Sequence, residues 1–129
     1  MSKKILITDD EPHIRMLLEQ TLEELEDYDV EFFLAENGEK ALEIIEEEHP
    51  GLVLLDVMMP KMNGFDVCRT VKQEWGMDDV YITLLTAKGQ EYDKEKGKEV
   101  GADLYITKPF NPDEIMALAV KVLGIELDD

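Results

Sequence analysis

The residue best suited to chemistry is Asp56, which ends an unbroken apolar run over residues 52–55. Pro60 and the pair Asn63-Gly64 follow, and a short apolar run bounded by turn-forming residues is typical of a strand buried on both faces. Asp56 is therefore expected at the carboxyl end of an interior strand, where open α/β sheets bind their ligands. An Asp in this position can also simply end the strand or cap the next helix, so a site requires further residues.

Other reactive residues also follow predicted strands. Asp9 and Asp10 follow residues 4–8, Thr86 follows residues 80–85, and Lys108 and Pro109 follow residues 103–107. Because the carboxyl ends of parallel strands lie at one edge of a sheet, these side chains are expected to meet Asp56 there. The predicted strand over residues 31–35 ends in Ala35 and Glu36 and contributes no reactive side chain.

The expected cluster is suited to phosphoryl transfer. Crowded carboxylates repel one another, and a hard divalent cation relieves that repulsion. Oxygen ligands without a cluster of His or Cys favour Mg²⁺ over Zn²⁺. The Lys108 amine and the Thr86 hydroxyl can each bind a phosphate oxygen. Each residue alone has a simpler role, but together they predict a phosphoryl-transfer site with Asp56 as the nucleophile.

Helices with one apolar face are predicted after the strands. Their apolar positions are Ile14, Leu17, Leu18, Leu22 and Leu25 in the first, Ala41, Leu42 and Ile45 in the second, Val67, Cys68, Val71 and Trp75 in the third, and Ile115, Leu118, Ala119 and Val122 in the last. Residues 90–100 form a weaker helix, interrupted by Gly97, which we expect to be the most mobile element. Five strands alternating with five helices predict an α/β fold, with a parallel sheet and helices on both faces.

Size and charge restrict the possible function classes. A chain of 129 residues with 44% hydrophobic residues suits one domain, here expected over residues 1–125 with a short tail at 126–129. The net charge of −18 disfavours direct contact with nucleic acid or anionic membranes and favours cationic partners. Without an export signal or an apolar stretch of membrane-spanning length, we expect a soluble cytoplasmic protein. The single Cys68 excludes an internal disulfide.

The order and spacing of several motifs make the chain resemble a receiver domain of the response regulators of two-component signalling, similar to the single-domain chemotaxis response regulator. The motifs are Asp9-Asp10, Leu55-Asp56-Val57-Met58-Met59-Pro60 with Gly64, Leu85-Thr86-Ala87, Gly101-Ala102-Asp103 and Lys108-Pro109-Phe110. The resemblance covers essentially the whole chain. It implies a flavodoxin-like fold, in which a five-stranded parallel sheet of order 2-1-3-4-5 is flanked by five helices.

The resemblance also implies a function. A histidine kinase or histidine phosphotransfer protein would pass a phosphoryl group to Asp56, in a reaction that the receiver itself catalyses, and the receiver would later dephosphorylate itself. The resemblance implies that Asp10, Asp56 and the Met58 carbonyl coordinate Mg²⁺, with Asp9 acting mainly through water. Lys108, Thr86 and the Ala87 N–H would bind phosphoryl oxygens. The peptide bond between Lys108 and Pro109 would be cis.

Two further features concern the switch and the lifetime of the phosphoryl group. The family implies that Thr86 moves toward the phosphoryl group and that Tyr105 turns inward behind it, although Tyr105 can equally be a half-buried residue of an edge strand. Met58 and Lys88 occupy positions that tune phosphoryl lifetime in the family. Neither resembles the amide and acid side chains of the fast-decaying chemotaxis type, so we predict slow self-dephosphorylation.

The partners and some alternatives stay open. Leu104 stands where dimerising relatives often repeat an Asp, and Lys121 is the only base of the last helix. We therefore expect a mainly monomeric receiver, whose unknown downstream protein target binds around the fourth helix and the fifth strand. A pseudo-receiver that acts without phosphorylation is the main alternative. A Mg²⁺-dependent phosphatase is disfavoured, because it would need an acid at the position of Met58. A flavin-binding domain with the same sheet topology is also disfavoured, because Asp9 and Asp10 would repel the flavin phosphate.

Overall fold

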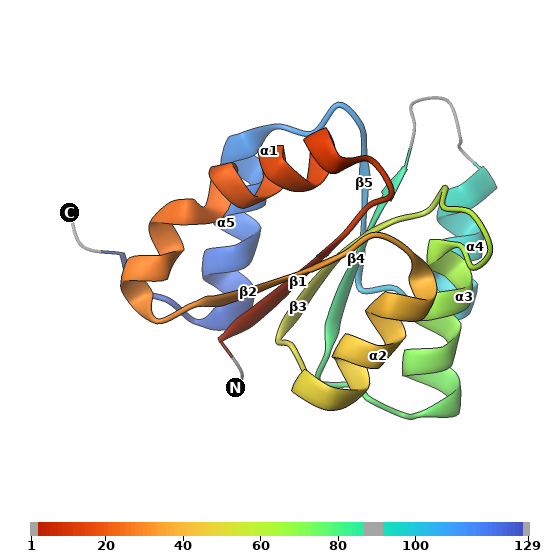
Figure 1. The fold of residues 1–129 in the computed structure, drawn as a ribbon. Helices are drawn as coiled ribbons and strands as arrows, with labels where there is room; N and C mark the ends of the chain where they lie inside the picture. Colours follow the sequence, from red (N-terminus) through yellow and green to blue (C-terminus); the bar gives the residue numbers. More distant parts are fainter. Residues whose placement is uncertain (1–2, 87–91, 128–129) are drawn as a thin grey trace.

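The structure of residues 3–86 and 92–127, a computed structural model, contains a parallel five-stranded sheet (Figure 1). The strands are β1 Lys4–Thr8, β2 Glu31–Ala35, β3 Leu52–Asp56, β4 Tyr81–Thr86 and β5 Leu104–Thr107. They lie in the order β2-β1-β3-β4-β5, and every neighbouring pair is parallel. The predicted fold class and strand order are confirmed. β4 begins and ends one residue later than predicted, and β5 begins one residue later.

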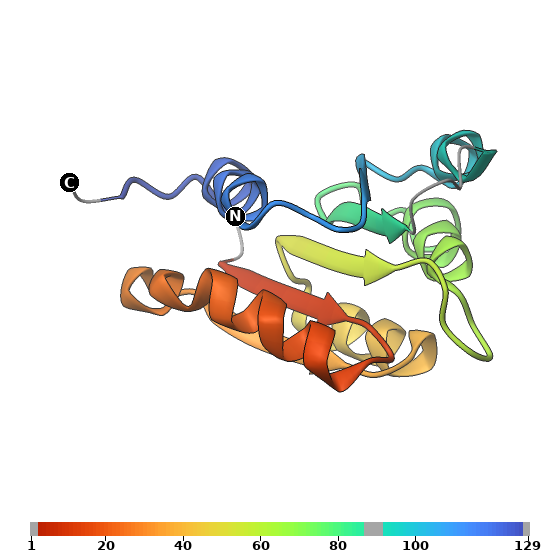
Figure 2. The same cartoon turned by 90° about the horizontal axis from the view of Figure 1, so that it is seen from above.

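The helices of the described ranges cover both faces of this sheet. They are α1 Pro12–Leu22, α2 Gly38–Glu48, α3 Gly64–Arg69, α4 Tyr92–Val100 and α5 Pro112–Leu123, with a 3₁₀ segment η1 Glu23–Tyr28 after α1 and a π segment η2 Thr70–Glu74 after α3. α1 and α5 pack together on one face, whereas α2, α3 and α4 lie on the other (Figure 2). None of these described helices is long and apolar enough to cross a bilayer.

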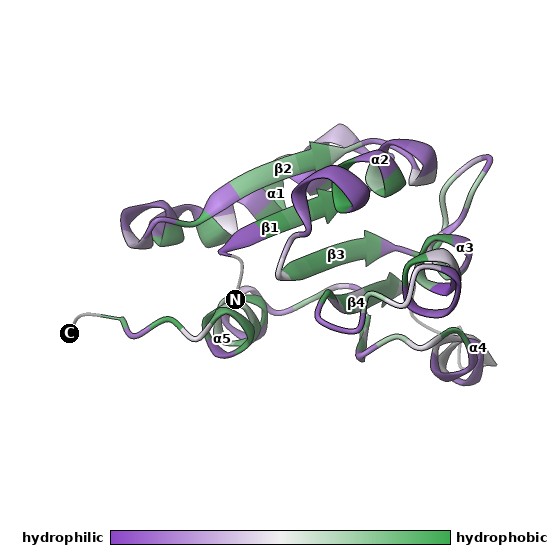
Figure 3. Cartoon of the chain, turned by 90° about the horizontal axis from the view of Figure 1, so that it is seen from below, coloured by the Kyte–Doolittle hydropathy of each residue, from purple (hydrophilic) through white to green (hydrophobic). Residues whose placement is uncertain are grey.

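The sheet separates two apolar clusters, and β3 belongs to both. Val53 and Leu55 pack on the side of α2 and α3, whereas Leu52 and Leu54 pack on the side of α1 and α5. Figure 3 shows mostly apolar strands between helices that carry both polar and apolar residues. Burial of both faces explains why β3 is a continuous apolar run. Asp56 is thereby carried by a strand that has no face toward solvent.

Three Asn residues begin helices. The side-chain oxygens of Asn37, Asn63 and Asn111 accept the backbone N–H groups of Lys40 at 2.8 Å, Asp66 at 3.0 Å and Asp113 at 2.8 Å. Each bond satisfies a donor that the first helical turn leaves free. Gly124 ends α5 with a φ of 65°, a left-handed conformation that glycine adopts without strain.

Two apolar residues that were predicted to face the core are exposed. Leu17 of α1 is 45% exposed, because it lies beside the buried stripe that contains Leu18. Trp75 is 37% exposed. Its N–H bonds to the Thr70 carbonyl at 2.9 Å, so the helix widens to an i→i+5 turn here. This wider turn takes Trp75 off the buried face that contains Val71, which the α-helical spacing did not anticipate.

The first and last helices also differ from the prediction in detail. The first helix ends as an α-helix at Leu22, and its 3₁₀ continuation still buries Leu25. The apolar side chains of α5 form a buried set of Ile115, Ala119 and Leu123 and a half-buried set that includes Leu118 and Val122. The buried face of α5 is therefore rotated slightly from the face that the spacing predicted.

Gly97 has a packing role in α4 that the sequence did not indicate. It is buried, and a Cβ atom at this position would lie 3.2 Å from Tyr105 Cδ2 and 3.4 Å from Leu84 Cδ1. A residue without a side chain therefore lets α4 approach β4 and β5 closely. The expected mobility of residues 90–100 stays a prediction, and residues 90 and 91 lie outside the described ranges.

Candidate metal and phosphoryl-transfer site

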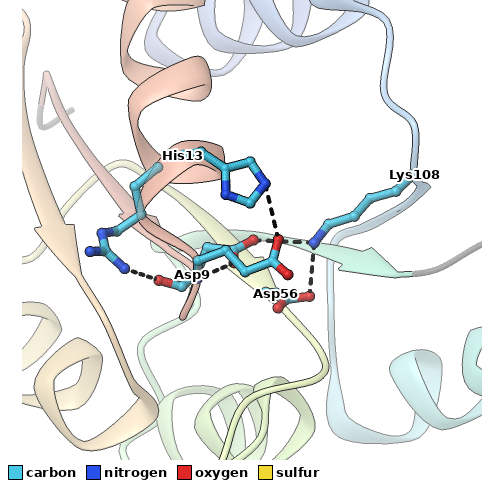
Figure 4. Close-up of polar contacts among 6 residues, drawn as sticks. Asp9, His13, Asp56 and Lys108 are labelled. Carbon is cyan, nitrogen blue, oxygen red and sulfur yellow. Dashed lines mark hydrogen bonds and ion pairs between the residues drawn. The ribbon is translucent and has the colours of Figure 1, made fainter.

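Charged side chains from three strands meet at the carboxyl edge of the sheet. Lys108 Nζ, just after β5, lies 3.1 Å from Asp9 Oδ2, just after β1, and 3.2 Å from Asp56 Oδ1, at the end of β3 (Figure 4). Asp9 is fully buried and Asp56 is nearly so. The convergence expected from the strand ends is therefore present, and one ammonium group bridges two carboxylates.

Asp9 is held through its backbone as well as its side chain. Its N–H donates to the Ala35 carbonyl at 3.2 Å, its Oδ1 accepts the Glu11 N–H at 2.9 Å, and its carbonyl accepts Arg15 Nη1 at 2.6 Å. The sequence did not point to Arg15, because the contact depends on how α1 packs against β1 rather than on any spacing. The end of β2, which has no reactive side chain, contributes through the Ala35 carbonyl.

The acidic residues can hold a metal ion. One carboxylate oxygen from each of Asp9, Asp10 and Asp56 lies within 4.8 Å of the others, and Asp10 is exposed. The Asp56 carboxylate also accepts a hydrogen bond from the Met58 backbone N–H, while the Met58 side chain is 66% exposed. Hard oxygen ligands of this kind suit Mg²⁺. The donor set therefore fits the cation that the sequence predicted.

Burial and crowding shift the pKa values of the central pair. Burial is the main reason that the pKa of Asp56 rises from 3.8 to about 6, and the charge of Asp9 adds to it, against the opposing effect of Lys108. Burial would by itself lower the pKa of Lys108, but the carboxylates of Asp56 and Asp9 outweigh it and raise that pKa above its usual value. A single ammonium does not fully compensate the two carboxylates, so a second cation is favoured here.

Thr86 and Lys108 are linked through the backbone. Thr86 ends β4 and is buried, and its carbonyl accepts the Lys108 N–H at 2.6 Å. The Lys108-Pro109 peptide bond is cis, as the resemblance implied. Ala87, predicted to bind a phosphoryl oxygen, and Lys88, predicted to tune its lifetime, lie outside the described residues. The hydrogen bond between the Lys108 N–H and the Thr86 carbonyl holds the ends of β4 and β5 together.

Tyr105 and His13 flank this cluster. Tyr105, in β5, is half-buried, and its ring lies against Gly97 of α4. His13, in the first turn of α1, is exposed, and its Nε2 lies 3.5 Å from Glu11 Oε2 (Figure 4). The position of Tyr105 under α4 is compatible with either of the roles considered for it. His13 contacts an exposed acid and none of the three clustered Asp residues in the contacts of the described residues.

Sequence comparisons agree with this geometry. The family described as the response regulator receiver domain matches residues 5–120. The chain is 47% identical over 123 residues to the alkaline phosphatase synthesis transcriptional regulatory protein PhoP of Bacillus subtilis, and 46% identical over 121 residues to the probable transcriptional regulator ycf27 of Porphyra purpurea. These matches cover 95% and 94% of this chain but 49% and 47% of the relatives. The chain thus spans about half the length of the curated relatives it matches.

Solved structures share the fold. The BeF3-activated DrrB receiver domain matches with a TM-score of 0.82 and 33% identity, over 96% of this chain and 99% of that one. The chemotaxis protein CheY4 of Vibrio cholerae matches with a TM-score of 0.80 and 30% identity, over 95% of this chain and 99% of that one. With the family match extending over most of its length, the chain belongs to the response regulator receiver domain family.

Proposed function

We propose that this receiver domain accepts a phosphoryl group on Asp56 from the phosphohistidine of a histidine kinase or a histidine phosphotransfer protein. An Asp56 carboxylate oxygen forms a bond to phosphorus as the P–N bond breaks, and the electron pair returns to the imidazole nitrogen. Water later hydrolyses the acyl phosphate to inorganic phosphate and the free carboxylate. The observation that carries this proposal is the buried Asp56 carboxylate, 3.2 Å from the Lys108 ammonium and beside two further acids.

The charged residues around Asp56 have distinct roles in this proposal. Asp10, Asp56 and the Met58 carbonyl would hold Mg²⁺, with Asp9 acting mainly through water. When bound, the ion offsets negative charge on the transferring group. Lys108 stays protonated because its pKa is raised, so its ammonium can exchange a carboxylate for a phosphoryl oxygen. The same residue would therefore stabilise both the resting and the phosphorylated site.

Thr86 would carry the signal away from the site. Its hydroxyl and the Ala87 N–H would bind phosphoryl oxygens, and a shift of Thr86 would leave space for Tyr105 to turn inward beside α4. This change would reshape the surface around α4, β5 and α5, where we expect the target protein to bind. Because Met58 and Lys88 supply no amide or acid side chain beside the phosphoryl group, we expect self-dephosphorylation to be slow.

The partners of this domain are expected to be proteins. A net charge of −18 disfavours direct binding of nucleic acid or anionic membranes by these residues. Leu104 in β5 and the single base Lys121 in α5 lead us to expect a mainly monomeric domain. The relatives described above are named as transcriptional regulators. For this chain, we propose that phosphorylation controls binding of a protein partner.

Intact-mass spectrometry tests phosphorylation directly. Incubation with a small acyl-phosphate donor and Mg²⁺ is expected to add the mass of one phosphoryl group to the wild type and to Asp79→Asn, and none to Asp56→Asn. Asp79 is a matched control, because it is an exposed Asp that precedes β4 at the opposite edge of the sheet. No added mass on a folded wild type would favour the pseudo-receiver. Decay as fast as that of chemotaxis receivers would contradict the slow dephosphorylation.

A further inference from the structure

Arg15 lies in the first turn of α1 and reaches back to the end of β1 that carries the acidic pair. Its Nη1 donates to the Asp9 carbonyl oxygen at 2.6 Å, a short hydrogen bond from a charged donor. Arg15 is half-buried, and it has this hydrogen bond to the backbone of Asp9 six residues earlier in the chain. This contact therefore joins α1 to the backbone at the end of β1.

The carbonyl that Arg15 binds belongs to the peptide plane between Asp9 and Asp10. A peptide group is planar and moves as a unit, so a donor held on the Asp9 oxygen fixes the direction in which the chain continues to Asp10. The other polar groups of Asp9 are held by Ala35, Glu11 and Lys108. Arg15 therefore acts on the link between the buried acid and the exposed one.

We propose that Arg15 is a positioning residue for the divalent-cation site. By holding the peptide plane between Asp9 and Asp10, it keeps the Asp10 carboxylate close to those of Asp9 and Asp56, where their oxygens lie within 4.8 Å. Without this bond, repulsion among the carboxylates drives the exposed Asp10 toward solvent. The inference rests on the proposed function, because it requires a cation to bind among these acids.

A purely electrostatic role of Arg15 predicts the opposite result. Removal of one positive charge makes the acidic site more negative, so a cation would bind more tightly. A positioning role predicts weaker binding, because groups that orient metal ligands change metal affinity about 10- to 100-fold when they are removed. The direction of the change in affinity therefore distinguishes the two roles.

Binding of Mn²⁺, followed by the EPR signal of the free ion and reversed by Mg²⁺, measures this affinity without phosphorylation. Arg15→Ala is expected to weaken Mn²⁺ binding about tenfold, and Arg15→Lys to give an intermediate affinity. The control is Lys40→Ala, which removes one positive charge from the small cavity that Arg15 also lines. The Lys40 ammonium pairs with Glu43 at 3.7 Å, so this variant is expected to bind Mn²⁺ as tightly as the wild type or more tightly.

The outcomes separate this inference from the proposed function. If Arg15→Ala binds Mn²⁺ as tightly as the wild type or more tightly, the positioning role is wrong while the cation site stands. If the wild type binds no Mn²⁺ that Mg²⁺ displaces, both are wrong. If Arg15→Ala does not fold, Arg15→Lys decides, and an affinity equal to that of the wild type overturns the inference. Saturating Mg²⁺ is also expected to restore the phosphorylation rate of Arg15→Ala, which a general loss of packing would not allow.

Discussion

Asp56 combines burial with a negative neighbour, and both oppose its charge. It is nearly buried beside Asp9, so losing its proton costs more free energy in the folded protein than in the unfolded chain. The Lys108 ammonium at 3.2 Å offsets part of that cost. At the scale of single residues, ionisation of Asp56 is therefore unfavourable in the folded protein without a divalent cation. The contribution of the Asp56 carboxyl to the free energy of unfolding must then fall as the pH rises.

Asp56→Asn is expected to stabilise the protein at neutral pH. The pKa of Asp56 is raised from 3.8 to about 6 in the folded state, so its contribution to stability is fully present below 3.8 and is lost as the pH rises through about 6. The variant escapes this loss, and its advantage over the wild type should reach at most about 3 kcal/mol and shrink as the pH falls. Urea unfolding over this pH range, without divalent cations, measures the difference.

The control for this pH dependence is Asp79→Asn, which changes an exposed Asp at the other edge of the sheet. Its stability relative to the wild type should vary little over the same range. A difference between Asp56→Asn and the wild type that stays constant with pH would show that burial of the Asp56 charge does not limit stability.

At the scale of elements, the third helix and its π segment hold the carboxyl end of α4. The connecting contacts run from Gln73 Nε2 to the Glu99 carbonyl at 2.7 Å, from Cys68 Sγ to the Val100 carbonyl at 3.5 Å, and from Lys72 Nζ to Asp103 Oδ2 at 2.9 Å. Asp103 Oδ2 also accepts the Ile82 N–H at 2.8 Å, which joins the start of β5 to β4. One ion pair therefore connects a helix, a loop and two strands.

Lys72→Met is expected to lower the free energy of unfolding by about 1–3 kcal/mol, because it leaves a partly buried Asp103 without its cation. The side chain of Lys72 is 8% exposed and that of Asp103 is 31% exposed. Lys40→Met removes the exposed pair with Glu43 and is expected to change stability by less than about 0.5 kcal/mol. Denaturant unfolding compares the variants. Equal and small losses would mean that the Lys72–Asp103 pair behaves like a surface ion pair.

At the scale of the whole molecule, 31 acidic and 13 basic residues leave a net charge of −18. Such an excess of one sign repels itself and opposes the compact state, and the acidic edge of the sheet adds a local concentration of the same charge. Monovalent salt screens this repulsion without binding, whereas a cation that binds the folded state alone stabilises it further by mass action.

Mg²⁺ is expected to raise the melting temperature above the value in NaCl of equal ionic strength, because only Mg²⁺ can bind among the site carboxylates. The additional rise should disappear in Asp10→Asn and persist in Asp79→Asn. Differential scanning calorimetry of the three proteins in both salts measures it. Equal melting temperatures of the wild type in the two salts would argue against a specific cation site.

Local patterns predicted the elements well where one periodicity held along a whole segment. The apolar run before Asp56 is β3, as predicted, because the burial of a strand depends on neighbouring residues. The prediction for Trp75 was wrong where α3 changes to a π turn. Gly97 was interpreted as an interruption of its helix. Its close approach to Tyr105 involves a residue of another element, so the local pattern did not indicate its packing role.

The sequence by itself determined the α/β class and the positions of the acids and the base at the strand ends. Both follow from patterns of adjacent residues, because these indicate the alternation of strands and helices and the burial of each strand. Only the tertiary structure decided that Lys108 bridges Asp9 and Asp56 and that Arg15 holds the Asp9 carbonyl. The residues that Lys108 joins are 99 and 52 positions away along the chain. Such distances depend on how the strands align and how the helices pack on the sheet, which no local pattern specifies.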